Sequence, residues 1–84
     1  MKQQKLLQKM ISGKANIRFA EMCKIVEAFG FRLDRINGSH HIFVHPEVPE
    51  LVNLQEVKGR AKPYQIKQFL SIVEKYNLQM REHK

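Results

Sequence analysis

Three of the four histidines of this 84-residue chain lie within six positions, at His40, His41 and His45. They directly follow the tripeptide Asn37-Gly38-Ser39. An unperturbed imidazole titrates near pH ~6.5, so both of its protonation states are available at neutral pH. This property makes histidine the commonest residue in general acid–base catalysis. The segment therefore predicts proton-transfer chemistry, provided that one of these rings can reach a substrate.

The local sequence predicts how the histidines are presented. Asn37-Gly38 favours a tight reversal of the chain, and residues 40–45 then read as a β-strand whose side chains alternate between two faces. We expect Ile42 and Val44 to point toward the core. The other set is expected to lie on an open sheet face: His41, Phe43 and His45. In a basic chain, such a row predicts a surface that handles RNA.

A metal site is a competing interpretation of the same histidines, and the spacing argues against it. His41 and His45 are four residues apart on a strand, which separates them by about 13 Å. A single ion with ligand bonds of ~2.1 Å cannot bridge that distance. His40 faces away from both. We therefore expect neither a metal nor any other cofactor.

Composition limits the class of protein. A chain of 84 residues with 43% hydrophobic and 27% charged residues predicts one small folded domain. Cys23 is the single cysteine, which is typical of a reducing cytoplasm, and its place on an apolar stripe predicts a buried small hydrophobe. No apolar run approaches the ~20 residues that span a bilayer. We expect a soluble cytoplasmic protein with no membrane partner.

The charge distribution suggests a polyanionic partner. The formal net charge is +7, and residues 1–20 and 57–73 contain basic residues but no acidic ones. Such unbalanced segments fit RNA, and they fit an acidic protein equally well. The candidate phosphate contacts precede or begin the last helix: Lys58, Arg60, Lys62 and Lys67.

The hydrophobic periodicity predicts the elements that carry these residues. The whole chain, 1–84, is expected to be one domain, with a helical extension at 2–14 and a core at 17–78. Within the core we expect a helix capped by Asn16 and ended by Gly30, strands over 31–36, 40–45 and 51–55, and a final helix that begins at Pro63.

Two details of the strands are also expected. Ile36 is out of phase with the alternation of the first strand, which predicts a bulge before the turn. Residues 47–50 are expected to form a connection, in which the prolines at 46 and 49 forbid regular pairing. Short connections favour antiparallel strands, and two helices on one face of such a sheet give a two-layer α+β sandwich.

The sequence resembles the HicA (YcfA-like) family of bacterial toxins. The similarity covers about residues 19–78. It rests on five motifs: Phe29-Gly30-Phe31, Gly38-Ser39-His40-His41, His45-Pro46, Leu51-Val52 and Lys62-Pro63. Two features depart from the family pattern. The N-terminal segment through about Asn16 lies outside the usual family start, and Gln55-Glu56-Val57 stands where many members have a further His-Pro element.

The resemblance implies a fold similar to double-stranded RNA-binding domains, α-β-β-β-α, here with an extra N-terminal helix. It also implies a ribonuclease that cuts mRNA and is neutralised by a HicB-like antitoxin protein. In the family pattern the catalytic histidine is two places after the serine, which is His41 in this chain.

The neighbouring residues have open roles. Gly38 is expected to give the turn its backbone freedom and to let a phosphate approach. Ser39 could donate to a phosphate or stabilise the turn, and His40 is expected to form hydrogen bonds, directed toward the helix layer or located at the strand edge. Phe43 could stack on an unpaired base or pack beneath a partner protein.

Two functions compete with a metal-independent endoribonuclease. The first is a non-catalytic RNA-binding module that uses the same sheet face. The second is an interaction protein whose basic surface meets an acidic partner. Cleavage of RNA that depends on His41 separates the first hypothesis from both alternatives.

Overall fold

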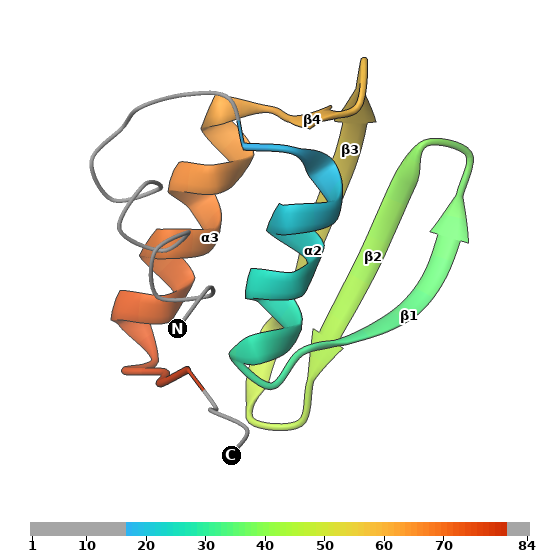
Figure 1. Ribbon diagram of the computed structural model, residues 1–84. Coiled ribbons are helices and arrows are strands. Elements are labelled where there is room, and N and C mark those ends of the chain that lie inside the picture. The colour runs from blue at the N-terminus through green and yellow to red at the C-terminus, as the bar shows by residue number, and fades with distance from the viewer. Residues whose placement is uncertain (1–16, 81–84) are drawn as a thin grey trace.

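We analysed a computed structural model of the chain, which describes residues 17–80. The elements are α2 (Phe19–Ala28), β1 (Arg32–Asn37), β2 (His40–His45), β3 (Val48–Val57), β4 (Arg60–Ala61) and α3 (Pro63–Lys75). The four strands form one antiparallel sheet in the order β1-β2-β3-β4. Both helices lie on the same face of this sheet (Figure 1). The predicted α+β sandwich is confirmed, whereas the predicted N-terminal helix and the Asn16 cap lie outside the described residues.

The third strand is longer than predicted, and a fourth strand follows it. β3 begins at Val48, so the expected connection over 47–50 is wrong, but pairing is irregular there, as the prolines predicted. Pro49 is tolerated because the pairing of β2 with β3 is irregular at this point, between Phe43 and His45. β3 then reverses into β4 through Lys58 and Gly59, with φ values of +53° and +78°. Two consecutive positive φ values are the signature of a type I′ hairpin turn.

The first hairpin agrees with its prediction. The register of β1 against β2 shifts between Leu33 and Arg35, which is the expected bulge. Gly38 is the first of the two turn residues and has φ +63°, a left-handed conformation that glycine adopts without strain. The turn brings Asn37 opposite His40, so β2 begins at the residue predicted.

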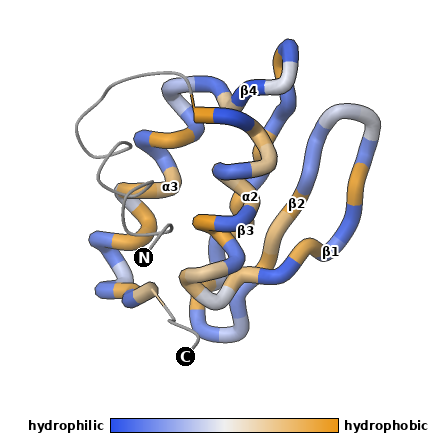
Figure 2. The backbone as a smooth tube through the Cα atoms, viewed as in Figure 1, coloured by the Kyte–Doolittle hydropathy of each residue, from blue (hydrophilic) through white to orange (hydrophobic). Residues whose placement is uncertain are grey.

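One end of each helix is marked by a residue whose backbone preference favours that position. Gly30, with φ +99°, directly follows the last turn of α2, and Pro63 occupies the first turn of α3. Both helices are amphipathic, and Figure 2 shows apolar and polar segments alternating along each of them. The buried side chains of the helices are Phe19, Met22, Ile25 and Val26 from α2, and Gln65, Ile66, Phe69 and Ile72 from α3.

The face of β2 that meets the helices is the opposite of the one predicted. His41 pairs with Leu54 of β3, and Phe43 pairs with Val52. Directly opposed residues share a face, and Leu54, Phe43 and Val52 are all core residues. His41, Phe43 and His45 therefore lie on the helix side, and the expectation of an open face is wrong. The helices cover this face, on which Val52 and Leu54 of β3 are also buried.

Candidate active site

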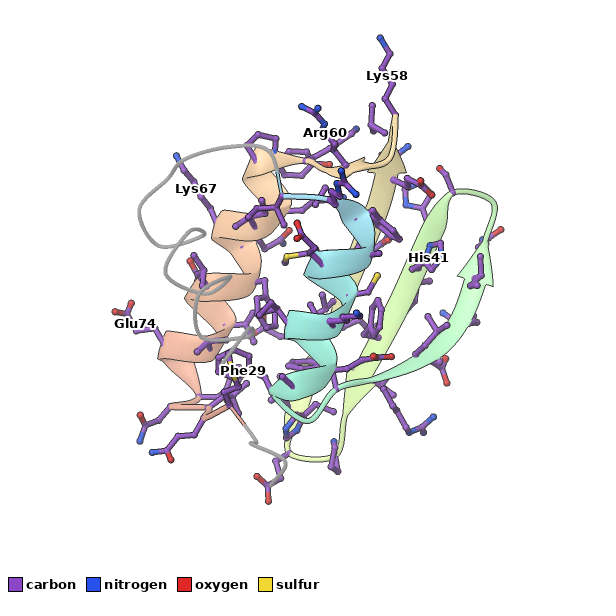
Figure 3. All side chains as sticks on the ribbon, in the orientation of Figure 1. Phe29, His41, Lys58, Arg60, Lys67 and Glu74 are labelled. Atoms are coloured by element: carbon purple, nitrogen blue, oxygen red, sulfur yellow. The ribbon has the colours of Figure 1, made fainter. Side chains whose placement is uncertain are left out.

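His41 lies at the edge of the helix layer, half-buried beside the first turn of α2 (Figure 3). Its ring packs edge-on against Phe19, with ring centroids 4.7 Å apart and an interplanar angle of 67°. The Nδ1 atom is buried and has no hydrogen-bond partner among the described residues. Nε2 is therefore the ring nitrogen through which this side chain can exchange a proton with a substrate.

The first turn of α2 is fixed to the β3–β4 hairpin. The Phe19 amide donates a hydrogen bond to the Gly59 carbonyl (2.9 Å), and Arg18 forms an isolated β-bridge with Arg60. The Arg18 amide also donates to the Glu21 carboxylate (3.1 Å), which satisfies one of the free amides at the helix start. These contacts hold the guanidinium-bearing residues 18 and 60 on the same side of the molecule as the Phe19–His41 pair.

The Gly38-Ser39 turn is fixed against the same hairpin. The Ser39 carbonyl accepts from the Glu56 amide (3.3 Å), and the Ser39 hydroxyl accepts from the Gln55 side-chain amide (3.4 Å). Both turn residues are exposed, and a Cβ built on Gly38 would meet nothing within 4 Å. The turn is thus accessible to a phosphate, and one of the two roles expected for Ser39, stabilisation of the turn, is seen directly.

His40 lies on the other side of the sheet from His41. Its Nδ1 is 3.1 Å from the Asn53 side-chain oxygen across the strand pair. The prediction that it makes a hydrogen bond is confirmed; of the two places expected for it, the helix layer is wrong, and His40 lies at the start of β2 on the other face. Strand alternation requires this result once His41 faces the helices. The two adjacent histidines therefore cannot act on the same phosphate from the same face.

The remaining two members of the predicted row are structural. Phe43 is 1% exposed and belongs to the core, so the proposed stacking of Phe43 on an RNA base is incompatible with this structure. His45 is 8% exposed; its Nδ1 accepts the Glu47 amide (3.0 Å), and its ring packs edge-on against Phe31 at 4.9 Å. The hydrogen bond closes the turn between β2 and β3.

The predicted basic residues fall into two groups. Lys58 and Arg60 lie on the β3–β4 hairpin, whose residues 59 and 60 contact the start of α2. Lys62 and Lys67 lie at the start of α3, and Figure 3 shows Lys67 on the opposite side of α2 from His41. The first pair is therefore linked to the start of α2 through the hairpin backbone, and the second pair lies at the start of α3.

Sequence analysis missed several residues beside the site. Phe19 was not singled out as a site residue, although its aromatic type, at the start of a helix, is suited to pack on an imidazole. On β1, Ile36 lies directly opposite His41 and is 56% exposed, and Leu33 lies opposite Phe43 and is 39% exposed. The out-of-phase position of Ile36 was visible in the sequence, but its consequence for the surface was not.

A metal site, a membrane span and a reactive thiol find less support in the described residues. No group of three or more histidine, cysteine, aspartate or glutamate side chains within residues 17–80 is arranged to hold a metal ion. Neither α2 nor α3 has the length and apolar character needed to cross a membrane. Cys23 is half-buried and packs against the core; burial, followed by the nearby Glu27 and Glu56 carboxylates, raises the pKa of its thiol to about 11.

The fold and the site define a small α+β protein with a histidine held at the edge of a basic surface. A family model described as "HicA toxin of bacterial toxin-antitoxin" matches residues 19–74. The chain therefore belongs to the HicA toxin family, and membership implies a toxin component with a cognate antitoxin. Searches of curated proteins and of solved structures returned no match.

Proposed function

We propose that this toxin is an endoribonuclease that cleaves mRNA in the cytoplasm with His41 as its acid–base residue. The observation that carries the proposal is the setting of His41. Its ring is held by Phe19, one nitrogen is buried, and the other is left for a substrate beside exposed basic residues. A ring fixed in this way loses little freedom when it meets a reacting group, which favours catalysis.

RNA supplies the nucleophile, so the protein needs no covalent intermediate and no metal for this reaction. His41 Nε2 accepts the proton of the 2′-hydroxyl as the 2′-oxygen forms a bond to phosphorus. The bond from phosphorus to the 5′-oxygen then breaks, and this oxygen takes up a proton from the imidazolium or from water. The products are a 2′,3′-cyclic phosphate end and a 5′-hydroxyl end.

Negative charge develops on the phosphoryl oxygens during this step. Arg18 and Lys58 are exposed and flank the contact between α2 and the β3–β4 hairpin, as does Arg60. Cations that are already in place stabilise such charge more effectively than water, which must reorient. In this proposal these three side chains hold the scissile phosphate and the phosphate beside it.

For the antitoxin, we propose a HicB-like protein that binds on the helix side of β1 and covers His41. The helices leave this part of the sheet uncovered (Figure 1), and Leu33 and Ile36 are exposed there. Aliphatic side chains do not stack on bases as aromatic rings do, so this surface fits a protein better than RNA. An antitoxin that contacts Ile36 would lie over its cross-strand neighbour, His41.

The decisive experiment compares two single-histidine variants in the presence of EDTA. The parent should cleave RNA and leave cyclic phosphate ends, and His41→Ala should lower the rate at least about 100-fold. His40→Ala is the matched control, because His40 adjoins His41 in sequence but lies on the other face. Both variants should keep the circular dichroism spectrum of the parent. A His41→Ala protein that cleaves at the parent rate would overturn the proposal.

A further inference from the structure

Tyr64 is an aromatic side chain that belongs neither to the His41 site nor to the proposed antitoxin surface. It lies in the first turn of α3, is 59% exposed and takes no part in the core. The five phenylalanines, by contrast, are all buried. Tyr76 is half-buried, and its hydroxyl donates a hydrogen bond to the Glu50 carboxylate. A tyrosine combines an apolar ring with a polar hydroxyl, which suits an exposed Tyr64 to a binding role if its surroundings also favour a ligand.

The charged residues near Tyr64 in its own segment are all basic. The Lys62 ammonium lies 5.7 Å from the centre of the Tyr64 ring, in a cation–π contact with one side of it. Lys67 follows three residues after Tyr64, so its exposed ammonium rises on the same side of α3. No acidic residue occurs between positions 57 and 73, so no carboxylate of this segment repels an anion.

The ring of Tyr64 is also available for stacking. No aromatic ring of residues 17–80 contacts it, and its one recorded partner is the Lys62 cation. A planar aromatic flanked by cations is the usual arrangement of surfaces that bind single strands, where bases stack and phosphates are neutralised. The lysines would also suit an acidic protein, so the exposed ring beside them is the feature that favours RNA.

The β3–β4 hairpin lies between the start of α2, beside His41, and the Tyr64 surface at the start of α3. The β3–β4 hairpin contacts the start of α2 on one side and leads through Ala61 directly into α3 on the other. Figure 3 shows Lys58, Arg60 and Lys67 projecting from this end of the molecule. A strand of RNA whose phosphate reaches His41 can therefore continue past the hairpin toward α3.

We propose that Tyr64, Lys62 and Lys67 form a subsite for single-stranded RNA, in which a base flanking the cleavage position stacks on the Tyr64 ring. This inference rests on the proposed ribonuclease function but concerns binding rather than cleavage. Tyr64 takes the stacking role that the burial of Phe43 excludes.

The chain allows a direct measurement, because it contains two tyrosines and no tryptophan. In a His41→Ala, Tyr76→Phe double variant, the intrinsic fluorescence comes from Tyr64 alone. Titration with an unstructured RNA decamer should quench this fluorescence. Adding Tyr64→Ala should weaken binding of a dye-labelled decamer by about 5- to 100-fold, whereas Tyr64→Phe should keep it within about threefold. Leu51→Ala, an exposed position on β3, is the matched control and should leave the affinity unchanged.

Two further readouts separate base stacking on Tyr64 from nonspecific RNA binding. Removing one base from the decamer at the stacked position should weaken binding to the His41→Ala parent but not to its Tyr64→Ala derivative. Lys67→Ala should lower the slope of log affinity against log salt by about 0.7. The Tyr64 variants should melt at the parent temperature, because the side chain is exposed.

Every outcome of this experiment decides the proposal. Unchanged RNA affinity in Tyr64→Ala overturns the subsite, even if the parent still cleaves RNA. The subsite is also overturned if Tyr64→Ala loses antitoxin binding but keeps its RNA binding. Tyr64-dependent binding by a protein that never cleaves RNA supports the subsite and overturns the ribonuclease. A parent that binds no RNA overturns both.

Discussion

The Phe19 ring meets the His41 ring edge-on, and the Phe19 amide is bonded to Gly59 of the β3–β4 hairpin. One residue therefore links the proposed acid–base group to the basic hairpin. Its side chain fixes the orientation of the imidazole, while its backbone fixes the position of the hairpin. This arrangement makes Phe19 a positioning residue rather than a catalytic one.

Phe19→Leu should therefore impair cleavage more than stability. Leucine keeps most of the buried volume, so the free energy of unfolding should fall by about 1.5 kcal/mol or less. The imidazole loses its edge contact, and small misplacements of a catalytic group can cost 10- to 100-fold in rate. We expect kcat to fall about tenfold with little change in KM. A variant of equal stability loss away from the site, such as Ile72→Val, should keep the parent kcat.

Removing the side-chain acceptor of Gln65 should destabilise the fold without touching the site. Gln65 is 5% exposed, and its side-chain oxygen accepts the Gln55 amide of β3 at 3.0 Å. Gln65→Leu leaves that amide without its partner, which typically costs about 1–3 kcal/mol. Urea unfolding should show this loss, whereas Gln68→Leu on the exposed side of α3 should change stability little. Equal midpoints for the two variants would contradict the role assigned to Gln65.

The sequence was sufficient for the fold class, both described helices and the first hairpin, because these depend on local signals such as Gly30, Gly38 and Pro63. It failed on which face of β2 the helices cover. Alternation divides a strand into two sets, but the buried set is chosen by packing, and β2 carries large apolar side chains on both faces. Ile42, for instance, is only 9% exposed although it points away from the helices.

The correct face was nonetheless implicit in the third strand. Val52 and Leu54 flank Asn53 in the sequence, an alternation that places both on one apolar face, and they are the cross-strand partners of Phe43 and His41. Combining the two strands needs their register, which depends on where β3 begins. The prolines concealed that start, because an irregular pairing of the kind seen around Pro49 leaves no local signal. The proximity of His41 to Phe19 could not be predicted for the same reason, since it depends on tertiary packing.

Acid should lower the free energy of unfolding by protonating Glu50, which lies in a surface cluster with Lys75 and Tyr76. The Glu50 carboxylate accepts hydrogen bonds from Lys75 Nζ and from the Tyr76 hydroxyl, both at 2.8 Å. These bonds, the one from Lys75 first, lower the pKa of Glu50 below its ordinary value. A lowered folded-state pKa gives stability that is present above the unfolded pKa of about 4.3 and is lost as pH falls through the folded value. The contact with Glu50 raises the pKa of Lys75, so its contribution lasts until strongly alkaline pH.

The test is the urea midpoint between pH 7 and pH 3 for the parent and for Glu50→Gln. The variant should be slightly less stable at pH 7 and should show a smaller decline in acid. Because the cluster is exposed, the difference should also shrink in 1 M salt. Parallel acid profiles for the two proteins would show that Glu50 contributes nothing to the pH dependence.

Cys23 should react slowly in the folded protein. Its pKa of about 11 keeps the side chain almost entirely in the thiol form at neutral pH, and the thiolate is the reactive species. Relative to an ordinary cysteine, the raised pKa alone lowers the thiolate fraction about 100-fold. Iodoacetamide at pH 8 should therefore label the native protein at least about 100-fold more slowly than the urea-unfolded chain. Similar rates in both states would mean that the thiol is not held as the structure shows.

The exposed pair on β1 gives the sharpest test of the antitoxin surface. Ile36→Glu places a carboxylate opposite His41, where a partner would have to bury it, so binding of the cognate antitoxin should weaken about 100-fold or more. Val57→Glu, at a similarly exposed position near the hairpin, is the matched control and should bind nearly as the parent does. Isothermal titration measures both affinities, and RNA cleavage by the free variants is measured in parallel. The surface is assigned correctly if Ile36→Glu loses antitoxin binding while it still cleaves RNA and is no longer inhibited. Intact antitoxin binding with impaired cleavage would instead make this pair a contact for RNA.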